Sequence, residues 1–550
     1  MTAQRAYRFF PAVVAVAVFL VFLPALQNDW VNWDDTGNFL ENPAYRGLGW
    51  AQIKWMWTTE LLRHYIPLSW MTLGLDYKLW GMNPFGYHLS NVLLHTASAV
   101  VFYLLALAIF KITIPADAEA SVAWGALFAA LFFALHPLRV ESVAWVTERR
   151  DVLSGLLYLL AILSYVHAYT PGRPIRRKYY WLSLASFALA LLSKEIVVTL
   201  PALLLLLDIY PLRRLPTSPR RWIAPPVRAV WLEKIPFFAL AAALLVHMFF
   251  VSNEALFDTE DGSGWLIKVT APIYNLAFYL WKTLVPVHLS PVYSFPKEID
   301  PAAASFEMSV FVVLTITAAA IVLRRKWPAL LTVWVAYILM LSPVLGFVAT
   351  GPHLPNDRNT YLACLGWALL AGAAILLWWR SSRTLRWLPV GTASVVVLML
   401  AALTAQQILV WRDSDSLWTQ ALRVEPSYTA YNNMAALLAS RGDDLWAAED
   451  FRKALALKPD YSPAHIGLGG ALLRLRRVDE AAREFQAALA LGKELAFAHN
   501  GLACALAWQG QPDQAIFHFE QAIRLRPDYA DARRNLAQVL ARKKAPKSKH

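Results

Sequence analysis

Long apolar runs separated by short polar loops fill residues 1–410, whereas residues 411–550 contain no such run. Because a membrane-spanning helix needs roughly 20 predominantly apolar residues, the pattern predicts a polytopic bundle with about eleven spans, several of them short. The predicted spans are 9–26, 89–110, 121–135, 151–169, 179–193, 196–209, 236–251, 308–323, 327–347, 361–379 and 387–409. We therefore divide the chain into a membrane domain, 1–410, a soluble helical domain, 411–542, and a basic tail, 543–550.

Basic residues gather in four of the connecting loops, those that follow residues 169, 209, 323 and 379. With eleven spans, all four loops fall on the same side as the N-terminus, which is the positive-inside pattern of membrane proteins. The N-terminus is thus predicted to be cytoplasmic. The segments 27–88, 136–150 and 346–360, the turn at Lys194-Glu195 and the whole C-terminal region are then predicted to face the opposite side.

Residues 265–286 are apolar but are interrupted by Lys and Pro. A crossing here would place the basic group after residue 323 outside, against the positive-inside pattern. We therefore expect a helix that lies in, or dips into, the outer interface.

Composition narrows the class of protein further. Hydrophobic residues make up 58% of the chain and charged residues 16%, whereas soluble domains carry about 25% charge, so an ordinary soluble enzyme is excluded. The net charge of +13 lies largely in the short basic loops, so it sets topology and we expect no nucleic-acid partner. The chain carries no Walker A motif, no Gly-rich dinucleotide fingerprint and no HExxH.

The C-terminal region repeats with a period of 34 residues. Apolar residues recur at Met434, Leu468, Leu502 and Leu536, and Phe recurs at Phe451, Phe485 and Phe519. This period, with small residues where helices cross, predicts a tetratricopeptide repeat solenoid. Such solenoids present a concave surface to peptides or partner proteins.

Two adjacent acids, Asp34 and Asp35, follow the first predicted span. Neighbouring carboxylates at a membrane surface repel each other and resist desolvation, which suggests chemistry or an ion site. Transfer of a sugar from a lipid-linked donor needs a base for the acceptor hydroxyl and cations for the leaving phosphate. A helix cap or an ion pair with a nearby Arg is an equal alternative for Asp34. A divalent cation held by the pair is also open, so the metal requirement is unknown.

Arginines on the predicted outer side run against the positive-inside pattern and need another explanation. The guanidinium fork binds phosphate in a bidentate manner, so we consider Arg150 and Arg358 as ligands of a donor phosphate. Pairing with Glu141, Glu148 or Asp151 is the alternative. The full set of candidate phosphate-binding residues is Arg63, His88, Arg150 and Arg358, and the supporting residues are Asn91, Glu141, Asp151, Lys194, Glu195 and Asp357.

Polar residues line one face of the second predicted span. His88, Asn91 and His95 are spaced i, i+3 and i+7, so they share a face that should point into the bundle. Packing inside the bundle and a role at the site both fit this pattern. Lys194 and Glu195 lie between two spans, where we expect a structural ion pair.

The membrane domain carries a series of short motifs, in the order Val31-Asn32-Trp33-Asp34-Asp35, Glu41-Asn42-Pro43, Pro67-Leu68-Ser69-Trp70, Gly86-Tyr87-His88-Leu89, His136-Pro137, Glu141-Ser142-Val143-Ala144-Trp145, Arg150-Asp151-Val152-Leu153, Ser193-Lys194-Glu195, Tyr279-Leu280-Trp281-Lys282-Thr283 and Asp357-Arg358-Asn359-Thr360-Tyr361. Taken in this order and followed by the repeats, the motifs resemble those of the GT-C membrane glycosyltransferases, and among them the bacterial relatives of the TMTC transmembrane O-mannosyltransferases with tetratricopeptide repeats. Asn359 departs from the pattern, because bacterial relatives often have Tyr at this position.

The resemblance implies an all-α GT-C bundle, a sugar donor on a polyprenyl or dolichyl phosphate, and an outer acidic motif as the catalytic element. It maps that motif onto Asp34 and Asp35, and it implies that the repeats engage a protein acceptor. We therefore expect a bacterial inner-membrane enzyme that transfers a hexose such as mannose, with inversion, to Ser or Thr outside the cytoplasm. Asp34 would be the base and Asp35 would orient it, and alanine at either should abolish transfer without affecting folding. The alternatives are a non-catalytic scaffold and an enzyme acting on lipid or glycan acceptors.

Overall fold

The computed structural model describes residues 3–61, 64–115, 119–222, 224–251, 265–293, 303–345, 355–382 and 387–544. These residues form helices and loops, and no strand occurs among them, so the predicted all-helical fold is confirmed. The chain divides into two compact units. The membrane unit contains residues 1–289 and 295–413, and the repeat unit contains 290–294 and 414–550.

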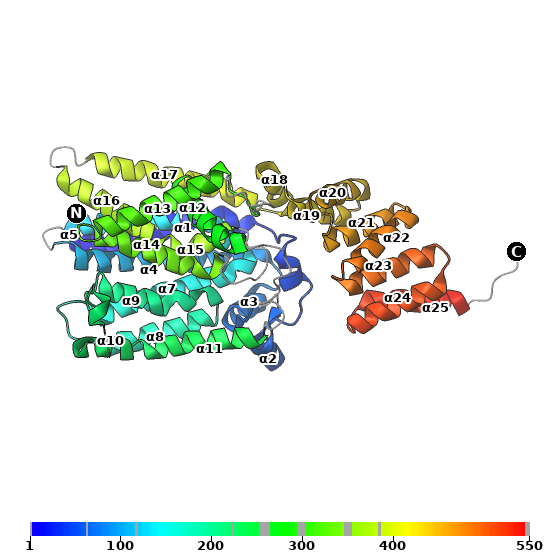
Figure 1. Cartoon of the computed structure of the whole chain (residues 1–550), viewed down its shortest axis with the longest axis horizontal. Helices are drawn as coiled ribbons and strands as arrows, with labels where there is room; N and C mark the ends of the chain where they lie inside the picture. Colours follow the sequence, from blue (N-terminus) through cyan, green and yellow to red (C-terminus); the bar gives the residue numbers. More distant parts are fainter. Residues whose placement is uncertain are drawn as a thin grey trace. The chain divides into compact units, whose positions relative to one another are not determined.

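The helices of the membrane unit run almost without interruption through the described residues (Figure 1). The N-terminal half contains α1 (Ala3–Phe22), α2 (Trp50–Thr58), α3 (Pro67–Trp80), α4 (Pro84–Thr113), α5 (Glu119–Ala134), α6 (Val140–Ala144), α7 (Arg149–Ala168), α8 (Arg177–Leu191) and α9 (Leu200–Ile209). The C-terminal half contains α10 (Arg228–Leu232), α11 (Ile235–Val251), α12 (Trp265–Leu284), α13 (Ala304–Leu323), α14 (Pro328–Leu341), α15 (Thr360–Ala363), α16 (Leu365–Ser381) and α17 (Trp387–Val410).

Each of the eleven predicted spans coincides with a helix, but fewer are long enough to cross a bilayer. Six described helices meet the length and composition of a span, and up to eight do so if two bent pairs each count as one. Helices α8, α9 and α14 have only 15, 10 and 14 residues. At 1.5 Å per residue they reach about 15–23 Å, less than the roughly 30 Å of the hydrocarbon core. The apolar helices make the chain an integral membrane protein, and the described helices that meet these limits are fewer than the eleven predicted spans. Helix α12, which we expected at the interface, is not among the six.

Helices α4 and α7 form the centre of the membrane unit. The span that contains α7 is 72% buried and the span of α4 is 56% buried, whereas those of α13 and α17 are 11% and 17% buried. Small residues allow close packing elsewhere, as is common in membranes. A Cβ atom on Gly372 of α16 would lie 2.5 Å from the backbone oxygen of Gly125 of α5, so these two helices approach almost backbone to backbone.

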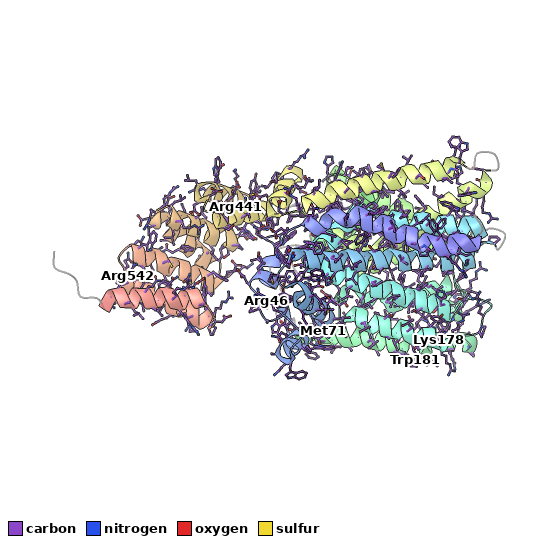
Figure 2. All side chains as sticks on the ribbon, turned by 180° about the vertical axis from the view of Figure 1, so that it is seen from behind. Arg46, Met71, Lys178, Trp181, Arg441 and Arg542 are labelled. Atoms are coloured by element: carbon purple, nitrogen blue, oxygen red, sulfur yellow. The ribbon has the colours of Figure 1, made fainter. Side chains whose placement is uncertain are left out.

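The two ends of the bundle carry different segments. Figure 2 shows Arg46 and Met71 at one end of the membrane unit and Lys178 and Trp181 at the other. Arg46 and Met71 belong to the predicted outer segment 27–88, whereas Lys178 belongs to a predicted cytoplasmic loop. The two segments therefore lie at opposite ends of the membrane unit.

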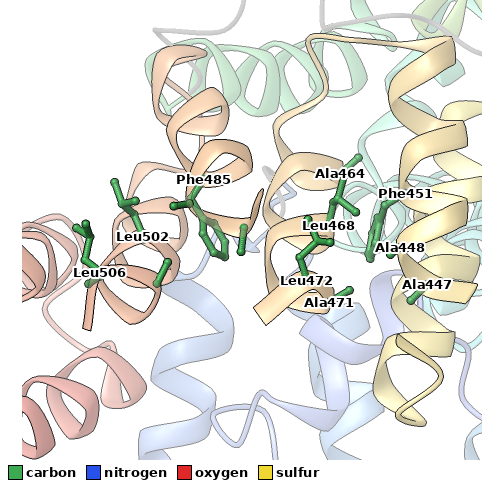
Figure 3. Packing of buried hydrophobic residues seen from close by; sticks show 14 of the residues in the cluster. Ala447, Ala448, Phe451, Ala464, Leu468, Ala471, Leu472, Phe485, Leu502 and Leu506 are labelled. Atoms are coloured by element: carbon green, nitrogen blue, oxygen red, sulfur yellow. The ribbon is translucent and has the colours of Figure 1, made fainter. Parts of the chain in front are cut away.

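The repeat unit is a series of helix pairs: α18 (Ser414–Val424), α19 (Tyr428–Ser440), α20 (Asp444–Leu457), α21 (Ser462–Arg474), α22 (Val478–Ala490), α23 (Leu495–Trp508), α24 (Pro512–Leu525) and α25 (Ala530–Lys544). Its core contains the periodic residues predicted from the sequence, including Phe451, Phe485 and Leu502 (Figure 3). Glycines make room for the rings: a Cβ atom on Gly501 would lie 2.2 Å from the Phe485 ring. The predicted repeat solenoid is confirmed.

Candidate active site

The carboxylate of Asp35 is buried and held by three donors. The backbone N–H of Val31 donates to one oxygen at 3.1 Å, and the backbone N–H and hydroxyl of Thr147 donate to the other at 3.3 and 2.7 Å. The side chain of Asp35 is 1% exposed, and burial raises its pKa to about 7. Asp35 therefore joins the acid loop, defined here as residues 28–35, to the turn before α7.

Asp34 has a different environment from its neighbour. It is half-buried, and in the described part of the chain its carboxylate forms no hydrogen bond or ion pair. Burial raises its pKa, while the charges of Arg150 and Arg358 oppose that rise. The result is a carboxylate that is free to accept a proton and that lies within electrostatic reach of two guanidinium groups.

Glu148 is the centre of a buried cluster of charges beside Asp34. Its carboxylate accepts two hydrogen bonds from Arg150, of 3.2 and 2.7 Å, and one from Lys194 at 3.1 Å. Lys194 also donates to Asp151 at 2.5 Å, and Ser142 donates to the other oxygen of Asp151 at 3.0 Å. The side chain of Glu148 has no exposed surface, so these cations compensate a charge that could not otherwise be buried.

Arg358 joins the same cluster from the segment before α15. Its side chain pairs with Glu141 and lies 3.3 Å from an oxygen of Glu148, and its backbone N–H donates to Glu141 at 3.0 Å. Asp357 beside it is buried. The neighbouring Asn359, which departs from the family pattern, donates to the Tyr279 hydroxyl at 2.9 Å.

The predicted pairing of Arg150 and Arg358 with internal acids is therefore present, but it does not use all of their donors. Arg150 uses Nε and Nη2, and Arg358 uses Nε and Nη1. Nη1 of Arg150 and Nη2 of Arg358 donate to no other residue that the structure describes. These two nitrogens can still bind an oxygen of a ligand.

The expected ion pair between Lys194 and Glu195 is wrong. Lys194 pairs with Glu148 and Asp151, and Glu195 pairs with His64, with 2.6 Å between Nδ1 and the carboxylate oxygen. The reason is the extended backbone of Lys194, with φ −161° and ψ 137°, because consecutive side chains of an extended chain point to opposite sides. The His64 ring, with smaller contributions from Arg150, lowers the pKa of Glu195 to about 2 although burial opposes this.

The remaining candidate residues lie in several places. Arg63 lies outside the described residues. His88 is 1% exposed, beside the backbone of Asn28 and Asp29, and no described contact joins it to Arg150 or Arg358. Asn91 binds the backbone oxygens of Val143 and Trp145 at 3.2 Å each and accepts a hydrogen bond from Arg149. Asn91 thus supports the segment that carries Glu148 and does not face the charge cluster itself.

Sequence reasoning did not place Glu148 and Thr147 among the site residues, yet they connect most of the others. The available signal was the close succession of Glu148, Arg150 and Asp151, which alternate in charge at the start of a buried helix. Among the described residues no group of three or more His, Cys, Asp or Glu side chains is arranged to hold a metal ion.

Comparisons with known proteins cover both units. Two family models described as tetratricopeptide repeat match residues 446–496 and 496–529. The chain is 25% identical over 508 residues to human protein O-mannosyl-transferase TMTC1, which covers 83% of this chain and 56% of that protein. It is 24% identical over 485 residues to Drosophila melanogaster protein O-mannosyl-transferase Tmtc3, covering 76% and 51%. The chain spans about half the length of these two relatives.

A shorter match and one solved structure complete the comparison. The chain is 36% identical over 156 residues to Xenopus laevis protein O-mannosyl-transferase tmtc2, covering 28% of this chain and 17% of that protein. The crystal structure of ArnT from Cupriavidus metallidurans bound to undecaprenyl phosphate matches with a TM-score of 0.37 at 16% identity, covering 88% of this chain and 80% of ArnT. The expected resemblance to the TMTC group is confirmed by the sequence relatives: over most of its length the chain is similar to proteins named protein O-mannosyl-transferase TMTC.

Proposed function

We propose that this chain is a GT-C membrane glycosyltransferase that moves a hexose such as mannose from a polyprenyl phosphate to a Ser or Thr hydroxyl of a protein outside the cytoplasm. The observation that carries the proposal is the carboxylate of Asp34, which has no partner among the described residues and lies within electrostatic reach of Arg150 and Arg358. A base next to cations with spare donors is the combination that transfer from a lipid-linked phosphate sugar requires. The names of the TMTC relatives support the same class of reaction.

In the proposed reaction Asp34 removes the proton from the acceptor hydroxyl while the hydroxyl oxygen bonds to the anomeric carbon of the sugar. The bond between that carbon and the phosphate oxygen breaks on the opposite face of the sugar, so the configuration inverts. The electron pair leaves with the polyprenyl phosphate. Nη1 of Arg150 and Nη2 of Arg358 donate to the phosphate oxygens, where negative charge grows in the transition state.

The charge cluster limits how the phosphate is held. Arg150, Lys194 and Arg358 carry three positive charges, and Glu141, Glu148 and Asp151 offer three carboxylates. The cluster therefore has little excess positive charge of its own. It serves to fix the two guanidinium groups in place, and their spare N–H groups rather than a net charge bind the phosphate. Arg63 is proposed as a further phosphate ligand from the same outer side.

The repeats are proposed to bind the acceptor protein, on the same side of the membrane as Asp34. The proposed location is a bacterial inner membrane with the N-terminus in the cytoplasm. Support for this comes from the basic loops of the sequence and from the position of Arg46, which belongs to the same predicted outer segment as Asp34, at the end of the membrane unit opposite to Lys178 (Figure 2).

The test is transfer by the purified full chain from a panel of radiolabelled polyprenyl-phosphate sugars to envelope protein extract. We expect label in protein from one hexose donor, and loss of that label with Asp34→Asn. The matched control is Glu307→Gln, because Glu307 is exposed at the start of α13. Label in lipid or glycan would identify the alternative acceptors. Binding of envelope proteins by the repeats, with no transfer from any donor, would favour a scaffold.

A further inference from the structure

Three tryptophans from distant parts of the chain stack beside the acid loop. Trp33 stacks on Trp145 with ring centroids 4.8 Å apart, and Trp145 stacks on Trp411 at 5.4 Å. Trp33 and Trp411 are nearly parallel, with an interplanar angle of 6° and centroids 6.4 Å apart. Trp145 and Trp411 are each 1% exposed, so the stack is part of the packed interior of the membrane unit.

Two rings of the stack adjoin elements of the candidate active site, and the third lies at the end of α17. Trp33 directly precedes Asp34, and Trp145 precedes the turn that carries Thr147 and Glu148. The guanidinium of Arg358 lies 5.5 Å from the centre of the Trp145 ring. Trp411 follows the last residue of α17.

A backbone hydrogen bond also joins the segment after α17 to the acid loop. The N–H of Asp29, in the acid loop, donates to the backbone oxygen of Arg412 at 2.8 Å. The segment after α17 thus holds the acid loop at two points, through the Trp411 ring and through the Arg412 carbonyl. This same segment leads along the chain into the helices of the repeat unit, the first of which, α18, begins at Ser414.

Asp34 has no side-chain partner among the described residues, so its neighbours must fix its position. Asp35 anchors the loop on one side of Asp34 through Thr147. On the other side the anchor is the Trp33 ring. We propose that Trp411 is a positioning residue of the transfer reaction, which holds Trp33, and through it the Asp34 carboxylate, in the geometry that the acceptor hydroxyl requires. This inference rests on the proposed function.

The indole N–H groups give a way to separate stacking from direct contact with substrate. Those of Trp145 and Trp411 are buried, and neither has an acceptor among the described residues. Phenylalanine at position 411 keeps an aromatic face for Trp145 but removes the N–H. A positioning role through stacking therefore predicts that Trp411→Phe preserves activity, whereas a role as hydrogen-bond donor to the substrate predicts that it does not.

The experiment compares Trp411→Phe and Trp411→Ala in the full-length protein with the control Trp387→Ala. Trp387 opens the same helix α17 and is 67% exposed. The first readout is hydrogen exchange of peptides that cover residues 28–40. The second is kcat and KM for the polyprenyl-phosphate sugar, measured separately. Both are recorded on protein that elutes as a single species in detergent.

We expect Trp411→Ala to accelerate exchange in the acid loop and to lower kcat about 10- to 100-fold with little change in the donor KM, since a misplacement of about 1 Å can cost 10²-fold. Trp411→Phe should retain at least about a third of kcat and near-normal exchange. Trp387→Ala should match the wild type in both readouts.

Several results would overturn the inference. Unchanged exchange in Trp411→Ala would show that the stack does not hold the loop. Faster exchange with an unchanged kcat would show that the loop position does not matter for transfer. A loss of kcat in Trp411→Phe as large as in Trp411→Ala would assign the effect to the N–H and not to stacking. A wild-type protein that transfers no sugar from any donor would instead refute the proposed function, and the exchange data would still report whether the stack holds the loop.

Discussion

Thr147 donates both its backbone N–H and its hydroxyl to one oxygen of Asp35, at 3.3 and 2.7 Å. This contact separates the roles of two acids that are adjacent in the sequence. Asp35 is a buried structural acceptor, whereas Asp34 keeps its carboxylate free of described partners. We therefore revise the expectation that alanine at either position leaves folding intact, and retain it for Asp34 alone.

Asparagine substitution should separate the two acids experimentally. Asp34→Asn removes a base whose carboxylate has no partner in the described part of the chain, so we expect transfer to fall about 10²- to 10⁴-fold with an unchanged unfolding midpoint. Asp35→Asn places an N–H₂ group against N–H or O–H donors that bind a carboxylate oxygen in the wild type. Leaving such buried groups unpaired should cost about 1–3 kcal/mol. Thermal unfolding in detergent measures the stability of both variants, and transfer assays measure their activity. Equal unfolding midpoints for the two would contradict the assigned roles.

The burial of Asp35 predicts a specific pH dependence of stability. Its pKa is raised to about 7 in the folded protein, against about 3.9 in an unfolded chain. Between these values the folded state binds more protons than the unfolded state, so the free energy of unfolding falls as the pH rises. The contribution of Asp35 to the free energy of unfolding is complete below about pH 4 and is lost as the pH passes through 7.

Comparison of the wild type with Asp35→Asn at two pH values isolates this contribution, since other titrating groups are common to both proteins. The wild type should exceed the variant in unfolding midpoint by more at pH 5 than at pH 8. A difference that is the same at both pH values would mean that Asp35 does not titrate in this range.

The sequence predicted the larger features because they depend on periodicity. Apolar runs located the helices, and a period of 34 residues located the repeat core around Phe451, Phe485 and Phe519. Fewer described helices than predicted spans reach the length of a crossing, because an apolar run such as 196–209 does not reveal that it starts in a 3-10 helix and that its α-helix begins only at Leu200.

Only part of the site was predicted, because local motifs do not reveal contacts that depend on the fold. The motifs identified Asp34, Arg150, Lys194 and Arg358, which the structure brings into one region. They could not reveal that Lys194 and Glu195 point apart, because this depends on one extended residue. Nor could they place Trp411 beside Trp33, because aromatic stacking across the whole chain leaves no local pattern.

Removal of Lys194 tests the buried charge cluster. Lys194→Met deletes the only ion pair described for Asp151 and one of three cations at Glu148. Breaking a buried pair from one side typically costs about 3–5 kcal/mol, because the remaining charge is left uncompensated. Addition of Asp151→Asn to Lys194→Met should restore part of that loss, since the stranded charge is then removed as well.

The control for the cluster is Arg325→Met, because Arg325 is exposed after α13 and surface substitutions usually lie within about 0.5 kcal/mol. Unfolding in detergent gives the free energies of the single and double variants. Strictly additive losses in the double variant would show that Lys194 and Asp151 do not interact.

Two glycines of the repeat unit should respond to alanine in opposite directions, although both lie inside helices. A Cβ atom on Gly501 of α23 would lie 2.2 Å from the Phe485 ring, whereas on Gly470 of α21 the nearest atom is the end of Arg474, at 3.8 Å. Overpacking against a buried ring costs about 1–3 kcal/mol, so Gly501→Ala should destabilise the repeats. Gly470→Ala should stabilise them by up to about 1 kcal/mol, because alanine is the better helix former and meets no obstacle. Hydrogen exchange of peptides from residues 428–544 in the full chain measures both effects, and destabilisation by both alanines would mean that the Phe485 contact does not determine the difference.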